Sequence, residues 1–176
     1  DPTNPRILYA STWNVRRTPY SLSSGGEGSA LWKSTDEGET WINISTNDGL
    51  PEGIWGISGI AVSPINSDIV WALIENKDGG IYKSLDAGKT WKLINKERKL
   101  RQRAWYYTRI YADTQDENTV YVMNVQYHQS KDGGKTFKEI GKENVHSDHH
   151  YAWLNGQKDG HIIIGNDGGC NITYDN

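Results

Sequence analysis

The sequence predicts an all-β chain built from repeated four-stranded antiparallel units, and three observations support this prediction. An eight-residue pattern, S-x-D-x-G-x-T followed by an aromatic residue, occurs three times, at Ser34–Trp41, Ser84–Trp91 and Ser130–Phe137. A polar turn that leads into a short β-branched and aromatic stretch precedes each copy and occurs once more near the C-terminus. The composition, with 19 Gly, 8 Trp and 10 Tyr but one Phe and one Met, suits short strands and tight turns rather than helices.

The octapeptide has the chemistry of a turn between two strands. Ser and Asp side chains hydrogen-bond nearby backbone amides, Gly supplies a positive φ, and Thr with the aromatic residue starts the next strand. We therefore interpret its carboxylates as structural and as poor catalytic candidates. The repeated positions are Ser34, Asp36, Gly38 and Trp41, then Ser84, Asp86, Gly88 and Trp91, then Ser130, Asp132, Gly134 and Phe137.

A period of about 40–50 residues is typical of a β-propeller, whose blades each have four antiparallel strands, here named a to d. Two repeats are complete. Their predicted strands are Ser58–Ser63, Ile69–Ile74, Gly80–Ser84 and Thr90–Ile94, then Trp105–Ala112, Thr119–Asn124, Gln126–Ser130 and Thr136–Ile140.

Partial repeats flank these two, so the sequence predicts a single partial β-propeller of about three and a half blades. The pieces are expected at about residues 1–44, 45–95, 96–141 and 142–176. A fourth octapeptide is cut short at Thr173–Asn176. Because propellers typically close with about 4–8 blades, we expect the remaining blades of the same propeller, or a second fragment, to complete it.

Composition excludes several classes of function. The net charge is −3 with acids and bases interspersed, which argues against nucleic acid and anionic membranes as partners. No apolar stretch is long enough to insert into a membrane, and no signal peptide opens this segment. The lone Cys170 excludes an intrachain disulfide framework.

The octapeptide is identified as an Asp-box, or bacterial neuraminidase repeat. The whole chain resembles the large secreted Asp-box propellers that are labelled sortilin-like or glycosyl hydrolase. The resemblance implies a secreted or periplasmic location but no single activity, because Asp-boxes occur in sialidases, xyloglucanase-type glycosidases, sorting receptors and photosystem assembly factors. The matching stretches are Asp1–Pro5, Leu8–Trp13, Leu31–Ser34, Gly59–Pro64, Arg103–Tyr107, Arg109–Asp113, His146–His150 and Gly165–Gly169.

In such blades the octapeptide lies at one end of the strands, and the b–c and d–a loops lie at the other end. The longest irregular segments all fall at that second end. Long loops on one side of a rigid scaffold are the usual place for binding. They are the b–c loop Asn14–Gly28, which contains Arg16, Arg17 and Tyr20, and the d–a loops Ser45–Trp55, Asn95–Ala104 and Lys142–His149.

His146, Asp148, His149 and His150 stand together in the last of these loops, and Asp167 lies on the neighbouring b–c turn. Histidine and aspartate are competent acid–base groups and ligands of divalent metals. We take Asp148, Asp167 and His149 as catalytic candidates. A divalent metal near His146, Asp148 and His149 is an alternative, although the spacing matches no metal motif and no cofactor is otherwise predicted. Hydrogen bonding of the loop to the inner strand explains the same residues without any chemistry.

A basic loop precedes three aromatic residues at 105–107. Its arginines could hold an anionic group while the aromatic faces stack on a ring. The alternative is a solvated loop followed by an inner strand whose aromatic residues pack between blades. The candidate ligand-binding residues are Arg101, Arg103, Trp105, Tyr106, His146 and His150.

Two functions remain open, and the sequence does not decide whether the chain is an enzyme. The first is a binding or scaffold propeller that recognises a protein or a glycan through the b–c and d–a loops. The second is a glycoside hydrolase that uses two carboxylates, with Asp148, Asp167, Asp113 and Glu52 as candidates. A sialidase is less favoured, because the arginines cluster in one or two loops instead of converging on a substrate carboxylate.

Overall fold

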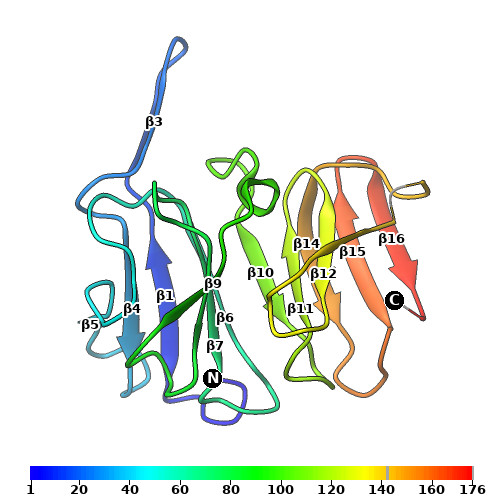
Figure 1. The fold of residues 1–176 in the computed structure, drawn as a ribbon, viewed down its shortest axis with the longest axis horizontal. Coiled ribbons are helices and arrows are strands. Elements are labelled where there is room, and N and C mark those ends of the chain that lie inside the picture. Colours follow the sequence, from blue (N-terminus) through cyan, green and yellow to red (C-terminus); the bar gives the residue numbers. More distant parts are fainter. Residues whose placement is uncertain (142, 176) are drawn as a thin grey trace.

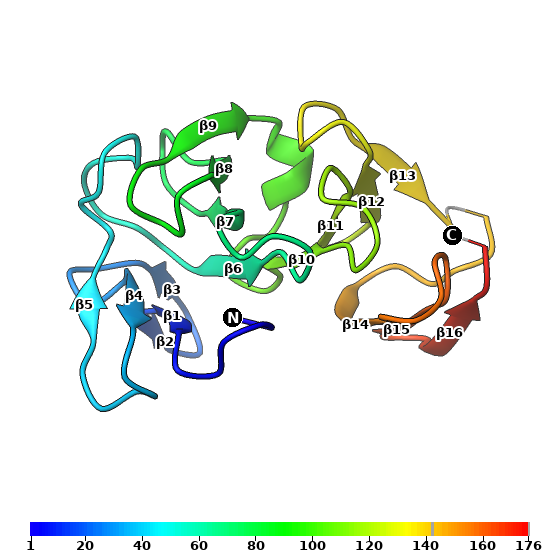
Figure 2. The same ribbon diagram turned by 90° about the horizontal axis from the view of Figure 1, so that it is seen from below.

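A computed structural model describes residues 1–141 and 143–175, and nearly all of its regular structure is strand. Four antiparallel sheets stand side by side along an arc, as the blades of a propeller do (Figures 1 and 2). The predicted partial β-propeller is therefore confirmed. The first sheet contains β1 (Leu8–Thr12), β4 (Ala30–Ser34) and β5 (Ile42–Asn43), and the second contains β6 (Ser58–Val62), β7 (Val70–Ile74), β8 (Ile81–Ser84) and β9 (Lys92–Asn95). The third contains β10 (Arg109–Ala112), β11 (Val120–Met123), β12 (Tyr127–Ser130) and β13 (Lys138–Ile140), and the fourth contains β14 (His149–Leu154), β15 (Ile162–Asn166) and β16 (Gly169–Thr173).

The second strand of each complete sheet is buried on both faces, which explains its unbroken apolar sequence. Because side chains alternate along a strand, β7 sends Val70, Ala72 and Ile74 into the core beside the first sheet, and Trp71 and Leu73 into the core beside the third. β11 repeats this arrangement: Val120 and Val122 face the second sheet, and Tyr121 and Met123 face the fourth. Three hydrophobic cores between four sheets thus hold the arc together.

The three octapeptide turns share one set of side-chain hydrogen bonds. In each turn the Ser hydroxyl donates to the Asp carboxylate and accepts from the Gly amide, and the Asp also accepts from the Thr amide at 2.8–2.9 Å. The residue before each Gly has a positive φ, and its amide donates to a backbone carbonyl that precedes β1, β7 or β11 in the respective sheet. We name the end of the sheets that carries these turns the box end, and the opposite end the loop end; the loop end is uppermost in Figure 1.

Two segments at the loop end differ from the sequence-based predictions. The b–c loop of the first sheet, expected to be irregular, forms a hairpin of β2 (Val15–Arg17) and β3 (Leu22–Ser24). The strand expected at Trp105–Ala112 begins only at Arg109, because residues 98–101 form a 3-10 helix, η1 (Arg98–Arg101), and residues 102–106 turn. Two predicted features reach beyond the described residues: the d–a loop that starts at Lys142, and the shortened octapeptide that ends at Asn176.

Candidate functional site

The loop end between the third and fourth sheets brings together six side chains, which we name the loop-end cluster. They come from the segment that connects η1 to β10, from the start of β14, and from the turn between β15 and β16. Its members are Arg103, Tyr106, Tyr107, Asp148, His150 and Asp167. All except Tyr107 are among the residues that the sequence analysis proposed.

Arg103 organises one side of the loop-end cluster. Its backbone has φ +51°, and its carbonyl accepts hydrogen bonds from the amides of Tyr106 at 2.8 Å and Tyr107 at 3.1 Å. This tight turn folds the aromatic residues back over the arginine, whose guanidinium lies 5.4 Å from the ring centre of Tyr106 and 5.7 Å from that of Tyr107. Arg103 Nη1 also lies 3.8 Å from Asp148 Oδ2. A cation thus sits between aromatic faces and a carboxylate.

Asp148 is the most enclosed carboxylate of the loop-end cluster. Its backbone has φ +65°, and its amide donates to the carbonyl of Val125 at 2.9 Å. The hydroxyl of Tyr107, a residue only 2% exposed, lies beside this carboxylate. Burial raises the pKa of Tyr107, and the Asp148 carboxylate raises it further. Tyr107 is therefore a neutral hydroxyl at physiological pH.

Asp167 and His150 form the exposed side of the loop-end cluster. His150 Nε2 and Asp167 Oδ1 are 2.7 Å apart, and both side chains are roughly half exposed. The His150 ring lies 5.1 Å from the ring centre of Tyr107 and 5.9 Å from that of Tyr106. The amide of Asp167 donates to the carbonyl of Asp148 at 3.3 Å. Asp148 and Asp167, two of the candidate acids of the sequence analysis, thus belong to one surface, each beside a different basic partner.

The other proposed site residues have different surroundings: Trp105 and His146 border the loop-end cluster, whereas Arg101 and His149 point elsewhere. Arg101 Nη1 donates to the carbonyl of Asn76 at 3.0 Å, which ties η1 to the second sheet. His146 packs against Gly168 and its Nδ1 contacts the carbonyl of Ser147 at 2.8 Å. His149, 3% exposed, lines a hollow of about 300 Å³ beside Tyr127 and Val145 instead of joining Asp148. Trp105 is half-buried and stacks edge-on against Tyr106.

The two further candidate carboxylates, Asp113 and Glu52, lie at opposite ends of the sheets. Asp113 was expected at the loop end, and this expectation is wrong. It lies in the turn between β10 and β11 at the box end, 5% exposed, where it accepts hydrogen bonds from the amides of Gln115 and Asp116 and from the Tyr121 hydroxyl. Glu52 does lie at the loop end, in the loop between β5 and β6.

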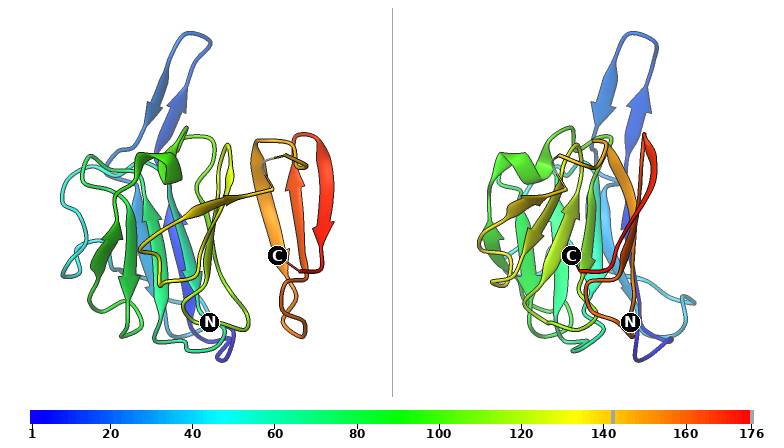
Figure 3. Two further views of the ribbon diagram at one scale, coloured as in Figure 1. Left: turned by 45° about the vertical axis from the view of Figure 1, so that its right-hand side comes forward. Right: turned by 90° about the vertical axis from the view of Figure 1, so that its right-hand side faces the viewer.

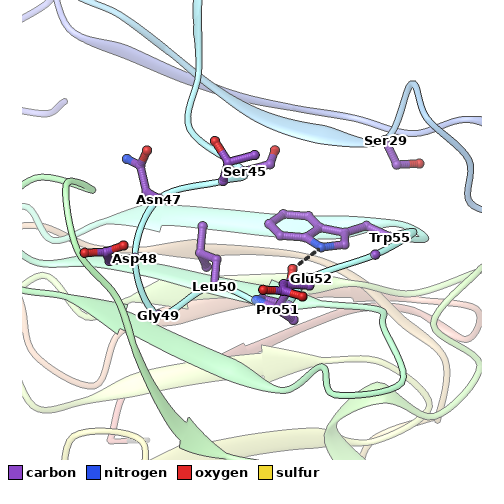
Figure 4. A pocket seen from close by; sticks show the side chains of 11 residues that line it. Ser29, Ser45, Asn47, Asp48, Gly49, Leu50, Pro51, Glu52 and Trp55 are labelled. Carbon is purple, nitrogen blue, oxygen red and sulfur yellow. Dashed lines mark hydrogen bonds between the residues drawn. The ribbon is translucent and has the colours of Figure 1, made fainter.

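That loop encloses a hollow of about 400 Å³ (Figure 4). Its shape depends on Trp55, 3% exposed, whose indole Nε1 donates to the carbonyl of Pro51 at 2.8 Å. Asp48 and Glu52 are both exposed on its rim. Within residues 1–141 and 143–175, no three His, Cys, Asp or Glu side chains are placed to hold a metal ion, here or in the loop-end cluster.

The sequence profile of the Sortilin-Vps10 family, described as sortilin, neurotensin receptor 3, matches residues 29–172. The chain belongs to the Sortilin-Vps10 family. No curated protein sequence matches it. The expected kinship with sortilin-like propellers is thereby confirmed.

Solved structures similar to this Sortilin-Vps10 chain confirm the propeller fold. The GH74 enzyme of Niastella koreensis has a TM-score of 0.63 and 22% identity over 96% of this chain and 25% of its own. The GH74 xyloglucanase of Xanthomonas campestris has a TM-score of 0.60 and 18% identity over 99% of this chain and 23% of its own. YCF48 bound to D1 peptide has a TM-score of 0.53 and 15% identity over 89% of this chain and 54% of its own. The chain thus spans about a quarter of the length of the GH74 structures.

In the part of the family member that the structure describes, no helix is long and apolar enough to cross a membrane.

Tyr107 is the residue of the loop-end cluster that the sequence analysis left out. The run of three aromatic residues after Arg103 was noted, but it was assigned to a strand, where Tyr107 would pack between blades. Only the turn at Arg103 places its hydroxyl beside Asp148.

Proposed function

We propose that the chain is a recognition segment of a larger propeller, which binds a protein or a glycan at the loop-end cluster. One observation carries this proposal: an exposed aromatic ring, a cation and two carboxylates share one surface. Tyr106 is 47% exposed, Arg103 lies against its ring, and Asp148 and Asp167 are adjacent. Aromatic and arginine side chains of this kind dominate the free energy of binding at many interfaces.

The pairing of the two carboxylates supports a recognition role. Asp148 is paired with Arg103, and Asp167 Oδ1 lies 2.7 Å from His150 Nε2. A carboxylate that a basic partner holds in one orientation can still accept hydrogen bonds from hydroxyl or amide groups of a ligand.

The wider setting is also a proposal. The remaining blades of the same propeller, or a second fragment, would close the circle between the fourth sheet and the first. We propose that the completed protein works outside the cytoplasm, in a secreted or periplasmic location, as the sortilin-like resemblance implies. The single-propeller division into pieces at about 1–44, 45–95, 96–141 and 142–176 belongs to the same proposal.

The test uses the natural protein that carries this chain, applied to an array of plant and bacterial oligosaccharides and to an array of extended peptides. We expect Tyr106→Ala and Arg103→Ala each to weaken the binding of an array member by about tenfold or more. Leu85→Ala is the matched control, since Leu85 is a 68% exposed apolar residue at the box end. Equal binding by the wild type and both cluster variants would overturn the proposal.

A glycoside hydrolase is the second candidate, because Asp148 and Asp167 both lie at the loop end on adjacent backbone. Carboxyl groups about 5–5.5 Å apart suit a retaining mechanism, and a separation of about 6.5–9.5 Å suits an inverting one. Hydrolysis of a polysaccharide panel by the wild type, with loss in both Asp148→Asn and Asp167→Asn, would favour this function. An intact protein that binds but releases no sugar would favour recognition.

A further inference from the structure

The β2–β3 hairpin projects from the loop end away from all four sheets (Figures 1 and 3). It forms a separate two-stranded sheet in which Val15 pairs with Ser24, Arg16 with Ser23, and Arg17 with Leu22. An isolated two-stranded hairpin is at best marginally stable in water. A third strand is the usual way to stabilise such a structure.

The base of the hairpin is held firmly. Trp13 Nε1 donates to the hydroxyl of Ser24 at 3.1 Å, and that hydroxyl donates to Glu75 Oε2 at 2.6 Å. The same carboxylate oxygen accepts the amide of Ile57 at 2.8 Å. These bonds tie the hairpin to the second sheet, so its projection is a defined feature of the fold.

The tip of the hairpin is also ordered by local bonds. Thr18 Oγ1 accepts hydrogen bonds from the amides of Tyr20 at 3.3 Å and Ser21 at 3.0 Å, and the amide of Thr18 donates to the carbonyl of Ser21 at 2.8 Å. Tyr20 is 97% exposed at this tip. Val15 and Leu22, 41% and 37% exposed, leave apolar surface along the strands.

Both edges of the hairpin offer free backbone groups. In an antiparallel pair, hydrogen-bonded and non-hydrogen-bonded residue pairs alternate. Thr18 bonds to Ser21, and Gly25 bonds to Asn14, so the amides and carbonyls of Val15 and Arg17 point outward from β2. By the same alternation, those of Leu22 and Ser24 point outward from β3. Either edge can accept another strand.

The charge of the hairpin indicates what that strand should carry. Arg16 and Arg17 are exposed, and neither forms an ion pair with any residue in the ranges 1–141 and 143–175. These two cations contrast with a chain whose net charge is −3. A strand with acidic side chains would gain both backbone hydrogen bonds and charge pairing.

We propose that the hairpin binds an extended, acidic segment of a protein partner, which adds to one of its edges as a third strand. This inference goes beyond the proposed function, because it uses a surface outside the loop-end cluster and a different mode of recognition. Backbone hydrogen bonds would supply affinity, and Arg16 and Arg17 would select acidic sequences.

The test measures fluorescence anisotropy of labelled seven-residue peptides with the natural protein that carries this chain. The probes are a Glu-Val alternating peptide, its Lys-Val counterpart, and a Glu-Val peptide with N-methylated backbone amides. We expect the acidic peptide to bind, and the basic and the N-methylated peptides to bind at least about tenfold more weakly. Binding of the acidic peptide should weaken with added salt.

Variants localise the contact. Val15→Pro removes an outward amide of β2 without removing a bond of the hairpin, and Val15→Ala is its matched control. Leu22→Pro and Leu22→Ala make the same comparison on β3. We expect one proline variant to lose peptide binding while both alanine variants keep it. The double variant Arg16→Glu, Arg17→Glu should lose binding of the acidic peptide and gain binding of the basic one.

Four outcomes would overturn the proposal: no binding of the acidic peptide, equal binding of the basic peptide, full binding by both proline variants, or self-association of the protein through the hairpin. Sedimentation of the wild type and of the double arginine variant detects the last outcome. Tyr106→Ala should leave peptide binding at the hairpin unchanged, so a failure here and a failure of the loop-end cluster are distinguishable.

Discussion

The box end and the loop end of the sheets carry aspartates in opposite states. At the box end, each Asp of the repeated turn accepts its hydrogen bonds from residues within four positions of itself, at 2.5–3.0 Å. At the loop end, Asp148 and Asp167 face residues from other segments, with an ion-pair contact as long as 3.8 Å. The carboxylates of the box aspartates are thus occupied by hydrogen bonds within their own turn, whereas those of Asp148 and Asp167 are held in position but can still contact a ligand.

The pKa values express the same difference. Hydrogen bonds from the hydroxyl and amide of Thr40 lower the pKa of Asp36 to about 2, and those from Thr136 do so for Asp132. For Asp86, partial burial acts to raise the pKa, but the bonds from Thr90 prevail and lower it to about 2. The turn thus stabilises the ionised form wherever it is repeated.

The largest effect that tests this comparison should come from glycine substitutions. A methyl group at Gly134 in the box would meet the Trp71 ring at 2.9 Å, in a backbone with φ +82°, whereas one at Gly53 in the loop end, with φ +85°, would meet nothing within 4 Å. We expect Gly134→Ala to lower the free energy of unfolding by about 3 kcal/mol, and Gly53→Ala by about 1 kcal/mol from the left-handed backbone alone.

Urea denaturation of both variants measures the two costs. Equal costs at the two positions would show that contact with the Trp71 ring adds nothing, which would contradict the tight packing of the box against the core.

A smaller difference in the free energy of unfolding should distinguish an aspartate of the box end from one of the loop end. Asp86→Ala removes the acceptor for the amides of Lys89 and Thr90 and for the Thr90 hydroxyl, so we expect a loss of about 2 kcal/mol in the free energy of unfolding. Asp167→Ala removes an exposed pair with His150 and should cost less than about 1 kcal/mol. Thermal melting of the two variants compares them directly; a larger loss in Asp167→Ala would mean that the loop end is structural as well.

The sequence predicted the box end better than the loop end, and the reason is the range of the interactions. The side-chain hydrogen bonds of the Ser34–Trp41 turn join residues within the same eight positions, and β7 and β11 show their burial as continuous apolar runs. Arg103 and Asp148 lie far apart in the sequence, and both adopt positive φ although neither is glycine. Their meeting depends on how the third and fourth sheets pack, which no local pattern encodes.

A different limit explains the two errors in the loops. The β2–β3 hairpin has neither an Asn-Gly nor an Asp-Gly turn signal in its sequence. Its tip is closed instead by a hydrogen bond between the side chains of Thr18 and Ser21. Trp105–Thr108 has the aromatic and β-branched composition of a strand, but the hydrogen bonds to the Arg103 carbonyl turn it instead. In both places specific hydrogen bonds override composition.

The last comparison concerns how buried histidines at the loop end and aspartates at the box end change the stability of the fold as the pH falls. His128 and His149 lie on the loop-end side of the third and fourth sheets, each 3% exposed, and burial lowers the pKa of both below the ordinary value of 6.5. For His128, nearby Lys99 lowers the pKa further, while Glu139 and Glu97 oppose this; for His149, Asp148 raises it, and His150 and His146 lower it. Both ring nitrogens of His128 and Nδ1 of His149 have no hydrogen-bond partner among residues 1–141 and 143–175.

Because the folded-state pKa of both histidines is lowered, the unfolded chain binds protons more readily than the folded one. The contribution of the neutral histidines to the free energy of unfolding is therefore fully present above pH 6.5 and falls as the pH drops below that value. The box aspartates act later: their folded pKa of about 2 lies below the ordinary 3.8, so their contribution is lost only between about pH 4 and 2. Urea midpoints measured from pH 8 to 2 should therefore fall in two separate steps. His128→Phe should reduce the first step and keep the second, whereas Asp86→Asn should reduce only the second; a single step that begins below pH 4 would show that the buried histidines do not couple protonation to folding.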